Sequence, residues 1–331
     1  MKKKALIVCS ESPYPDVVGG YERLIKDYQA HVFSDYDVYF LVCRRDSVKQ
    51  LLHYGVPVRS KAERERILSQ EFAFAFFVHS DFDCDGPNVV RPLIDRIPSF
   101  CFVQLHPNDQ IEDQRFQGII THHTEGPHKN VLRIGGSYNP EVFYKERQSE
   151  EFIVCVGRIH PHKNQLALVR DYRKRIFRKH GMPLYLVGGS SEPDYFLSVN
   201  QFVDGVSVLS TCDPENPLGG SSWRTSHDIA ALCNRARMFV MPSEKESFCI
   251  ALIEALACGT TCVVDGLYYG FDEHDLRPHV YGNIAGKDGS ILDLIDEVLT
   301  KDIRIDASEW VKKYSLAEHQ KQLMAFIHKR L

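Results

Sequence analysis

The chain has 331 residues, with 40 Lys+Arg against 44 Asp+Glu, 44% hydrophobic residues and ten cysteines. This length suggests two domains of similar size, and the mixture of apolar and charged residues is that of a folded globular protein. The formal net charge of −4 excludes the strongly basic field that is typical of nucleic-acid-binding proteins. No run reaches the roughly 18 apolar residues of a membrane span, and the N-terminal residues lack a signal-peptide pattern. We therefore expect a cytoplasmic protein.

Five of the cysteines lie in short apolar runs, and the sequence contains no Cys-x-x-Cys. Free cysteine packs as a small apolar residue, and scattered thiols stay reduced in the cytoplasm. We therefore expect buried structural thiols, with neither a disulfide nor a zinc site. The five residues are Cys9, Cys43, Cys101, Cys155 and Cys262.

Short β-rich runs alternate with helical patterns along the whole chain. This alternation predicts an α/β fold with two parallel sheets, each covered by helices on both faces. In the first half we expect strands at residues 5–10, 38–43, 72–79, 100–106 and 118–122, and a helix at 21–33. In the second half we expect strands at 152–157, 184–188, 206–209, 238–241 and 261–264, and helices at 163–179, 228–236, 249–257 and 292–299.

A charged stretch at residues 144–151 separates the two halves. We expect an N-terminal domain of residues 1–146 and a second domain of residues 147–306. The segment 307–331 has a helical pattern and can pack back on the first domain as an appendage. Residues 211–226 are rich in Ser, Pro and Gly and predict a long loop, which in a compact domain often has a function.

Several known ligand-binding motifs are absent. No Gly-x-Gly-x-x-Gly follows an expected strand, which removes the usual signature of a dinucleotide-dependent dehydrogenase, and no Gly-x-Ser-x-Gly elbow is present. Residues 282–288 approach a P-loop but are one residue short and lack its Ser/Thr, so we expect a surface loop there. The pairs His160/His162 and His122/His123 have no acidic or thiol partner at matching spacing, so we expect no metal site.

The most informative segment is residues 241–259. An apolar strand ends at Pro242-Ser243, an acidic turn follows, and a helix begins near Phe248 and ends at Gly259. The free N–H groups at the start of that helix, at residues 248–251, suit a phosphate. Glu246 and Glu254 flank this anion site and can accept hydrogen bonds from sugar hydroxyls. The alternative is an ordinary amphipathic helix with two solvated carboxylates, and the segment alone decides neither.

A second candidate follows the first strand of the second half. Gly157 ends that strand, and Arg158 and Lys163 stand across a short loop that opens the next helix. An arginine fork and a compact lysine charge together suit a diphosphate. The alternative is a surface loop with two basic residues.

Two weaker candidates lie in the first half. The paired glycines Gly19-Gly20 precede a helix and would allow the backbone to approach a ligand closely, although they also fit a plain tight turn. His106 ends an expected strand and would face a ligand there, although a lone histidine at a strand end is more often structural.

Together these motifs resemble the retaining glycosyltransferases of family 4, which are also described as glycosyl transferases group 1. The resemblance covers nearly the whole chain, in the order expected for the family. It is most specific at Pro242-Ser243 combined with Glu246-x7-Glu254. The resemblance implies the GT-B fold, in which two Rossmann-like doubly wound domains face each other across a cleft. In that family the second domain binds the nucleotide-sugar donor and the first binds the acceptor.

The resemblance also implies roles for single residues. Arg158 and Lys163 would hold the donor diphosphate, and Glu246 would bind hydroxyls of the transferred sugar, with His106 beside it. Ser247 and Cys249 stand where the family usually has glycine, and their side chains would narrow the sugar pocket. The donor-binding residues implied in this way are Gly19, Gly20, Gly157, Ser243, Phe248, Cys249, Ile250, Ala251 and Glu254, with Glu254 on the ribose.

The function implied by the resemblance is transfer of a hexose, glucose by this analogy, from a UDP-sugar with retention of configuration. It would need no metal or other cofactor, and the acceptor would be a saccharide or lipid-linked saccharide of polysaccharide biosynthesis. The same resemblance allows a peripheral contact with the inner face of the membrane and implies no nucleic-acid partner. Two alternatives stay open, namely a nucleotide-sugar epimerase and a non-catalytic nucleotide-sugar-binding subunit.

Overall fold

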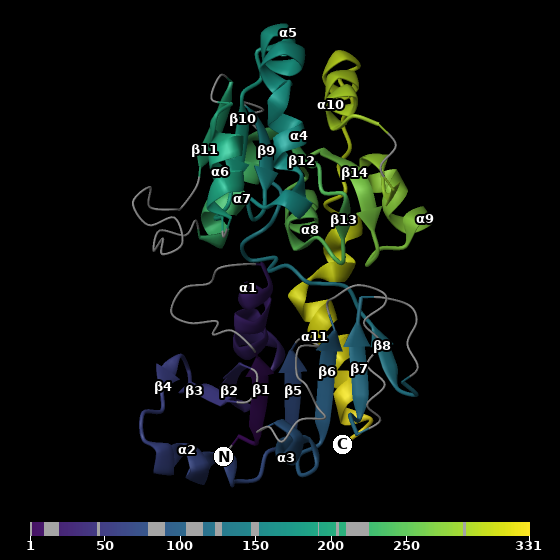
Figure 1. Cartoon of the computed structure of the whole chain (residues 1–331). Coiled ribbons are helices and arrows are strands. Elements are labelled where there is room, and N and C mark those ends of the chain that lie inside the picture. Colours follow the sequence, from purple (N-terminus) through teal and green to yellow (C-terminus); the bar gives the residue numbers. More distant parts are fainter. Residues whose placement is uncertain are drawn as a thin grey trace. The chain divides into compact units, whose positions relative to one another are not determined.

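The computed structural model describes residues 2–9, 20–44, 47–78, 90–103, 115–122, 128–146, 152–190, 192–202, 205–209, 225–286 and 289–331. The chain divides into two compact α/β units (Figure 1). Unit 1 comprises Met1–Gly136 and Leu316–Leu331, and unit 2 comprises Ser137–Ser315. The first crossing lies at 136/137 instead of 146/147, because Tyr138 and Phe143 are buried in the core of unit 2.

Unit 1 is built on one sheet in the order β4-β3-β2-β1-β5-β6-β7-β8. The strands from β2 through β1 to β8 run parallel, whereas β3 and β4 add an antiparallel edge that the sequence did not predict. The order reverses beside β1, as in a Rossmann-like sheet. The strands are β1 (Lys4–Cys9), β2 (Asp37–Arg44), β3 (Ser47–His53), β4 (Val56–Pro57), β5 (Phe74–Val78), β6 (Ser99–Val103), β7 (Gly118–Thr121) and β8 (Val131–Arg133).

Helices cover both faces of this sheet, because neighbouring residues of each strand point to opposite sides. On one face, Leu6 and Phe77 join the apolar side chains of α2 (Lys61–Leu68) and α3 (Val90–Ile94). On the other face, phenylalanines of β5 and β6 pack against the helical turn η1 (Tyr28–Val32), which continues α1 (Gly20–Asp27).

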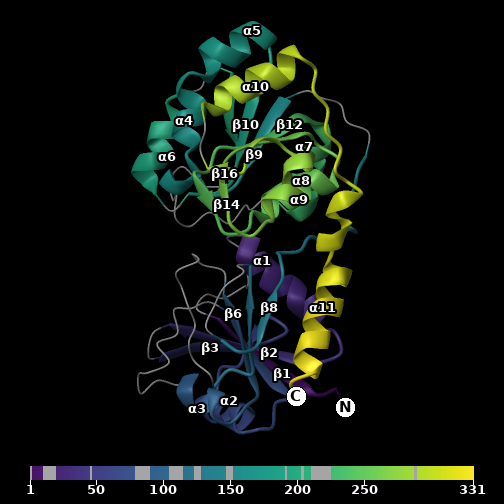
Figure 2. The same cartoon turned by 90° about the vertical axis from the view of Figure 1, so that its right-hand side faces the viewer.

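The C-terminal helix α11 (Leu316–His328) packs on the same face of unit 1 as η1 (Figure 2). Its Phe326 lies directly on the backbone of Gly118, where an added Cβ would be 2.5 Å from the ring. The expected single helix at 307–331 is wrong. The tight turn η5 (Trp310–Tyr314) belongs to unit 2, and the extended Ser315 separates it from α11.

Unit 2 has a second sheet in the order β11-β10-β9-β12-β14-β13. The five expected strands are present, and the order reverses beside β9. Residues 282–286, which we expected in a surface loop, instead contribute to β15 and β16, which pair with β14. The strands are β9 (Phe152–Val156), β10 (Leu184–Val187), β11 (Val206–Leu209), β12 (Ala236–Met241), β13 (Lys245–Glu246), β14 (Cys262–Tyr268), β15 (Tyr281–Asn283) and β16 (Ala285–Gly286).

The helices of unit 2 follow the expected positions, with one exception. The expected helix at 163–179 is interrupted into four short pieces: η2 (Pro161–Lys163), α4 (Gln165–Arg170), η3 (Arg173–Phe177) and α5 (Arg178–His180). None of the helices in the described residues combines the length and apolar character that crossing a bilayer requires. The remaining helical segments are α6 (Pro193–Asn200), α7 (Ser226–Arg235), α8 (Ile250–Ala257), α9 (Glu273–Leu276), η4 (Arg277–His279) and α10 (Ile291–Thr300).

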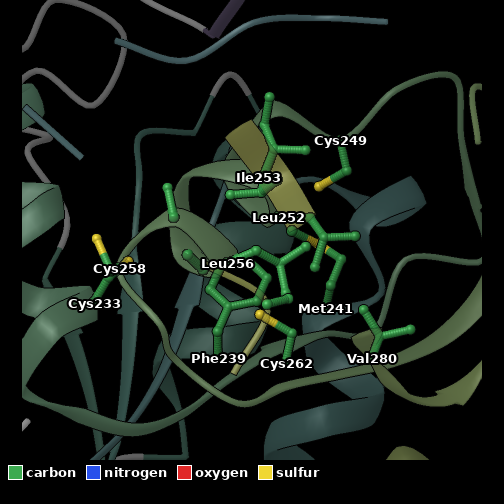
Figure 3. Close-up of a cluster of buried hydrophobic side chains, with 14 of the residues drawn as sticks. Cys233, Phe239, Met241, Cys249, Leu252, Ile253, Leu256, Cys258, Cys262 and Val280 are labelled. Atoms are coloured by element: carbon green, nitrogen blue, oxygen red, sulfur yellow. The ribbon is translucent and has the colours of Figure 1, made fainter. Parts of the chain in front are cut away.

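The helix α8 is embedded in the apolar core of unit 2, where Leu252 and Leu256 are fully buried (Figure 3). Four cysteines share this cluster, and Figure 3 draws Cys233 and Cys258 next to each other. The eight cysteines within the described residues are all buried free thiols, as expected, and the other two, Cys84 and Cys212, lie outside those residues.

Candidate active site

In a doubly wound sheet, ligands bind at the carboxyl ends of the strands where the strand order reverses. In unit 2 this point lies between β9 and β12, which are followed by Gly157 and Ser243. An added Cβ on Gly157 would meet no atom within 4 Å, so the backbone is open to a ligand there. The neighbouring Gly188, after β10, has φ +152°, and its added Cβ would lie 2.1 Å from the Gly157 carbonyl oxygen. Sequence reasoning did not single out Gly188, whose role depends on this backbone contact.

The central feature of the site is an ion pair between the Lys163 ammonium and the Glu246 carboxylate. The two side chains are only 17% and 8% exposed. Burial acts to lower the pKa of Lys163, but the Glu246 carboxylate outweighs it, and the pKa lies above its ordinary value. The structure therefore places a fixed positive charge and a carboxylate together at the strand ends, as the two separate motifs suggested.

Glu246 is positioned by a strand, although the sequence suggested only an acidic turn. Residues Lys245 and Glu246 form β13, which runs parallel to the end of β14. The Leu267 amide donates to the Glu244 carbonyl (2.9 Å), and the Tyr269 amide donates to the Glu246 carbonyl (3.0 Å). An added Cβ on Gly266 would lie 2.0 Å from the Ser243 carbonyl oxygen, so this close approach needs a glycine. Sequence reasoning also missed Gly266.

The helix α8 begins directly after β13. Cys249 is its N-cap and makes no side-chain capping hydrogen bond, and Ile250 and Ala251 are half-buried. The first N–H groups of an α-helix have no partner within the helix and carry partial positive charge. The helix ends before Gly259, whose φ of +71° is the left-handed conformation we expected there.

The Cys249 thiol is buried beside the apolar core around α8, close enough to Glu246 and Lys163 to feel their charges. It is 4% exposed and belongs to the cluster around α8, where Figure 3 draws it beside Leu252 and Ile253. Burial raises the pKa of this thiol, which stays uncharged. Of the two residues that replace family glycines, only Ser247 is half-buried.

Two further candidate residues are buried near the same strand end. Glu254 lies on α8 and is 2% exposed. Ser243 is fully buried, and its hydroxyl donates to the Met241 sulfur (3.2 Å). The Ser243 side chain therefore supports the turn instead of facing solvent.

The loop that carries Arg158 is held by its backbone. Arg158 itself is exposed, and its carbonyl accepts a hydrogen bond from the buried Gln165 side chain (2.8 Å). The His160 and His162 rings hydrogen-bond each other (2.6 Å between Nδ1 atoms). Burial, together with the nearby Lys163 charge, lowers the pKa of His162 to about 4, so this ring is neutral at pH 7.

Within the described residues, no group of three or more His, Cys, Asp or Glu side chains is placed to hold a metal ion. The other histidine candidate, His122, is buried, and its ring bonds the Ile134 carbonyl (2.8 Å). His123 lies outside the described residues, as do Gly19 and His106. Gly20 is the first residue of α1, in unit 1.

Residues 150–276, which contain this site, match the family model described as Glycosyl transferases group 1. These residues are similar to the glycosyltransferases that this model describes. The expected resemblance and the expected enzyme class are thereby confirmed at the level of this group, and the assignment to family 4 stays a prediction. No curated protein sequence matches the chain.

Solved structures of similar fold extend the likeness to the whole chain. Sucrose-phosphate synthase from Thermosynechococcus elongatus has a TM-score of 0.69 at 14% identity, covering 99% of each chain. HepE from Anabaena, solved with UDP and glucose, has a TM-score of 0.67 at 12% identity, covering 98% of this chain and 99% of that one. The catalytic domain of starch synthase IV from Arabidopsis thaliana, bound to ADP and acarbose, has a TM-score of 0.60 at 10% identity, covering 100% and 99%. At such identities these structures establish the fold, which is GT-B with two parallel-sheet α/β domains.

Proposed function

We propose that this group 1 glycosyltransferase transfers a hexose, glucose first among the candidates, from a UDP-sugar with retention of configuration. The acceptor in this proposal is a saccharide or a lipid-linked saccharide of polysaccharide biosynthesis, in the cytoplasm or at the inner face of the membrane. The observation that carries the proposal is the buried Lys163–Glu246 pair at the carboxyl edge of the unit 2 sheet, next to the start of α8.

The positive charges at this edge suit the donor diphosphate. Lys163 remains charged although it is mostly buried, and Arg158 is exposed on the same loop. The first amides of α8, at Ile250 and Ala251, add the partial charge of a helix N-terminus. In this proposal Arg158 and Lys163 bind the diphosphate, and the α8 amides contact the phosphate and the sugar.

Carboxylates in a phosphate site need another partner, and sugar hydroxyls supply it. Glu246 accepts a hydrogen bond from the Lys163 ammonium and would also accept hydrogen bonds from hydroxyls of the transferred hexose. Glu254, one helical turn after Ile250, would accept hydrogen bonds from the ribose. In both roles the carboxylate oxygens accept hydrogen bonds that the sugar hydroxyls donate.

Retention follows if the acceptor attacks the face of the sugar from which the diphosphate departs. The bond between the anomeric carbon and the β-phosphate oxygen breaks, the acceptor oxygen bonds the same face, and its proton passes to the departing phosphate oxygen. The products are the glycoside and UDP. Catalysis then depends on stabilising negative charge on the leaving group in a pre-organised site. Arg158, Lys163 and the α8 amides supply the positive charge that stabilises the leaving group, so we propose that the reaction needs no metal.

The ligands bound in two structural neighbours guide the choice of donor. HepE was solved with UDP and glucose, whereas starch synthase IV was solved with ADP. UDP-glucose is therefore the first donor to test, and ADP-glucose is its rival.

The experiment is a panel of UDP-, ADP- and GDP-sugars, followed by thermal shift and product analysis with and without saccharide acceptors. We expect UDP-glucose to stabilise the protein, to hydrolyse slowly alone, and to give an acceptor product whose anomeric proton shows retained configuration by NMR. Activity that survives EDTA would support the metal-free mechanism. A new sugar isomer without acceptor would instead indicate an epimerase, and binding without turnover on any acceptor would indicate a binding subunit.

A further inference from the structure

The chain passes between the two units twice, and the two crossing segments lie side by side within unit 2. The first crossing enters unit 2 at Ser137, and the second leaves it at Ser315. Tyr138 and Ser315 form a parallel bridge, and the Tyr138 amide donates to the Tyr314 carbonyl (3.1 Å). The backbones of the two crossing segments are therefore linked directly by hydrogen bonding.

The Tyr314 ring reaches from this crossing to the turn that carries the candidate active site. Phe248, between Glu246 and α8, stacks on Phe271 with ring centroids 4.3 Å apart. Tyr314 packs edge-on against both rings, with centroids 5.5 Å from Phe248 and 5.8 Å from Phe271. The rings of Phe248, Phe271 and Tyr314 thus connect the turn before α8 with the second crossing segment, which ends at Ser315.

Tyr314 also contacts Trp310 and Lys313 of its own turn, η5. The Trp310 ring meets it edge-on at 5.5 Å, and the Lys313 ammonium lies 5.2 Å from its centroid. Trp310 and Lys313 both bond Asp275 of α9, the indole N–H at 3.0 Å. Tyr314 therefore contacts Phe248 and Phe271 as well as Trp310 and Lys313, and its carbonyl accepts the hydrogen bond from the other crossing segment.

We propose that Tyr314 is a positioning residue that couples occupation of the donor site to the two crossing segments. This inference rests on the proposed function, because it takes a nucleotide diphosphate as the ligand at residues 246–251. An anion that engages the α8 amides shifts the turn at Phe248, and the aromatic contacts transmit that shift to Tyr314 and the Tyr138–Ser315 bridge. Tyr314 lies outside the matched residues 150–276, so the group 1 match assigns it no role.

The alternative is that Tyr314 merely fills space in the core. A space-filling role predicts lost stability with no change in how the crossing segments respond to ligand. A matched control is Tyr185, which is also half-buried and packs on a buried phenylalanine, Phe152, with centroids 4.4 Å apart. Tyr185 lies on β10, which is separated from β12, β14 and β13 by β9 in the sheet order.

The experiment is hydrogen exchange by mass spectrometry on the full chain, with and without saturating UDP, ADP or GDP. The variants are Tyr314→Ala, Tyr314→Phe and Tyr185→Ala. We expect the bound nucleotide to slow exchange in peptides covering 246–253 and also in those covering 137–138 and 314–316. In Tyr314→Ala the first effect should remain and the second should disappear, whereas Tyr314→Phe and Tyr185→Ala should keep both.

Kinetics give a second readout. A misplaced site far from the chemistry can cost up to roughly 100-fold in rate, so we expect Tyr314→Ala to lower kcat about 10- to 100-fold with a smaller change in donor KM. Protection at 246–253 without any at 137–138 and 314–316 in the wild type would overturn this inference alone. Crossing-segment protection that persists in Tyr314→Ala would also overturn it. No protection anywhere with any nucleotide would overturn both this inference and the proposed function.

Discussion

Lys163 and Glu246 lie 83 residues apart in the chain, and their side chains form one ion pair at 17% and 8% exposure. Neither charge can be removed without leaving the other partly buried and unpaired. In the proposed function the pair therefore joins two properties that are usually separate, the stability of this edge of the sheet and the binding of the donor. Substitutions at the two positions can separate these properties.

We predict that Lys163→Met destabilises the protein and removes its turnover. Breaking a buried pair by removing one partner costs about 3–5 kcal/mol, because the remaining Glu246 carboxylate stays desolvated. Losing one donor to the leaving group costs roughly 10²–10³-fold in kcat. Urea denaturation and initial rates with UDP-glucose measure the two effects.

The double variant Lys163→Met/Glu246→Gln separates the two effects. With both groups neutral, most of the lost stability should return, while turnover should remain lost. Lys179→Ala, which removes a surface partner of Asp296, is the control and should change neither measurement. Wild-type turnover in the double variant would rule out the proposed role of the pair.

Arg158→Ala should affect turnover alone. Arg158 is exposed, and its backbone carbonyl, which the substitution keeps, is the group that bonds Gln165. We expect the melting temperature to stay within about 1 °C, because surface substitutions change stability by no more than roughly 0.5 kcal/mol. The kcat should fall roughly 100-fold, because the positive charge that stabilises the diphosphate is lost. An unchanged kcat would exclude Arg158 from the donor site.

Gly266→Ala should displace Glu246. The new Cβ would lie 2.0 Å from the Ser243 carbonyl, so β13 must move away from β14. We expect a loss of about 1–3 kcal/mol in unfolding free energy, as for other overpacked sites, together with weaker donor binding by calorimetry. Gly289→Ala, whose Cβ would meet no atom within 4 Å, is the matched control. Equal donor affinity in both variants would mean that β13 does not position Glu246.

Much of the fold could be predicted because its central strands are continuous apolar runs. β5 (Phe74–Val78) is buried along its whole length, and such runs are typical of parallel strands covered on both faces. The strand β3 (Ser47–His53), next to the edge strand β4, mixes polar and apolar residues, and its pairing with β2 decides its structure. The break at Ser315 likewise depends on its bridge to Tyr138, which no local pattern indicates.

The charged residues of the candidate site could be found from the sequence, whereas the residues that position them could not. Arg158 and Lys163 lie on the segment that follows β9, and Glu246 lies a few residues after β12, so a search of the segments after the expected strands finds them. Their pairing depends on which strands are neighbours, and the sequence does not state that β9 lies beside β12. Gly188 and Gly266 each lie against the backbone of another segment, which leaves no room for a side chain. Tyr314 packs against two aromatic rings that are distant in the sequence. Such contacts between distant segments are outside the reach of motif spacing.

The acid stability of unit 1 should depend on a buried histidine of α11. His319 on α11 is buried, and its Nε2 is hydrogen-bonded to the hydroxyl of Tyr28 in η1. Burial, helped by the nearby His122, lowers the pKa of His319 from 6.5 to about 3. The folded protein therefore keeps this ring neutral at pH values where the unfolded chain takes up a proton.

The sign of the effect follows directly. Above pH 6.5 neither state is protonated at His319, so its neutral burial costs nothing there. As the pH falls from 6.5 toward about 3, only the unfolded chain binds the proton, and stability is lost. At pH 5 the loss amounts to about 2 kcal/mol. We expect His319→Phe to flatten the pH dependence of the unfolding free energy between pH 7 and 5 by that amount. An equal slope in wild type and His319→Phe would show that His319 is not the titrating group.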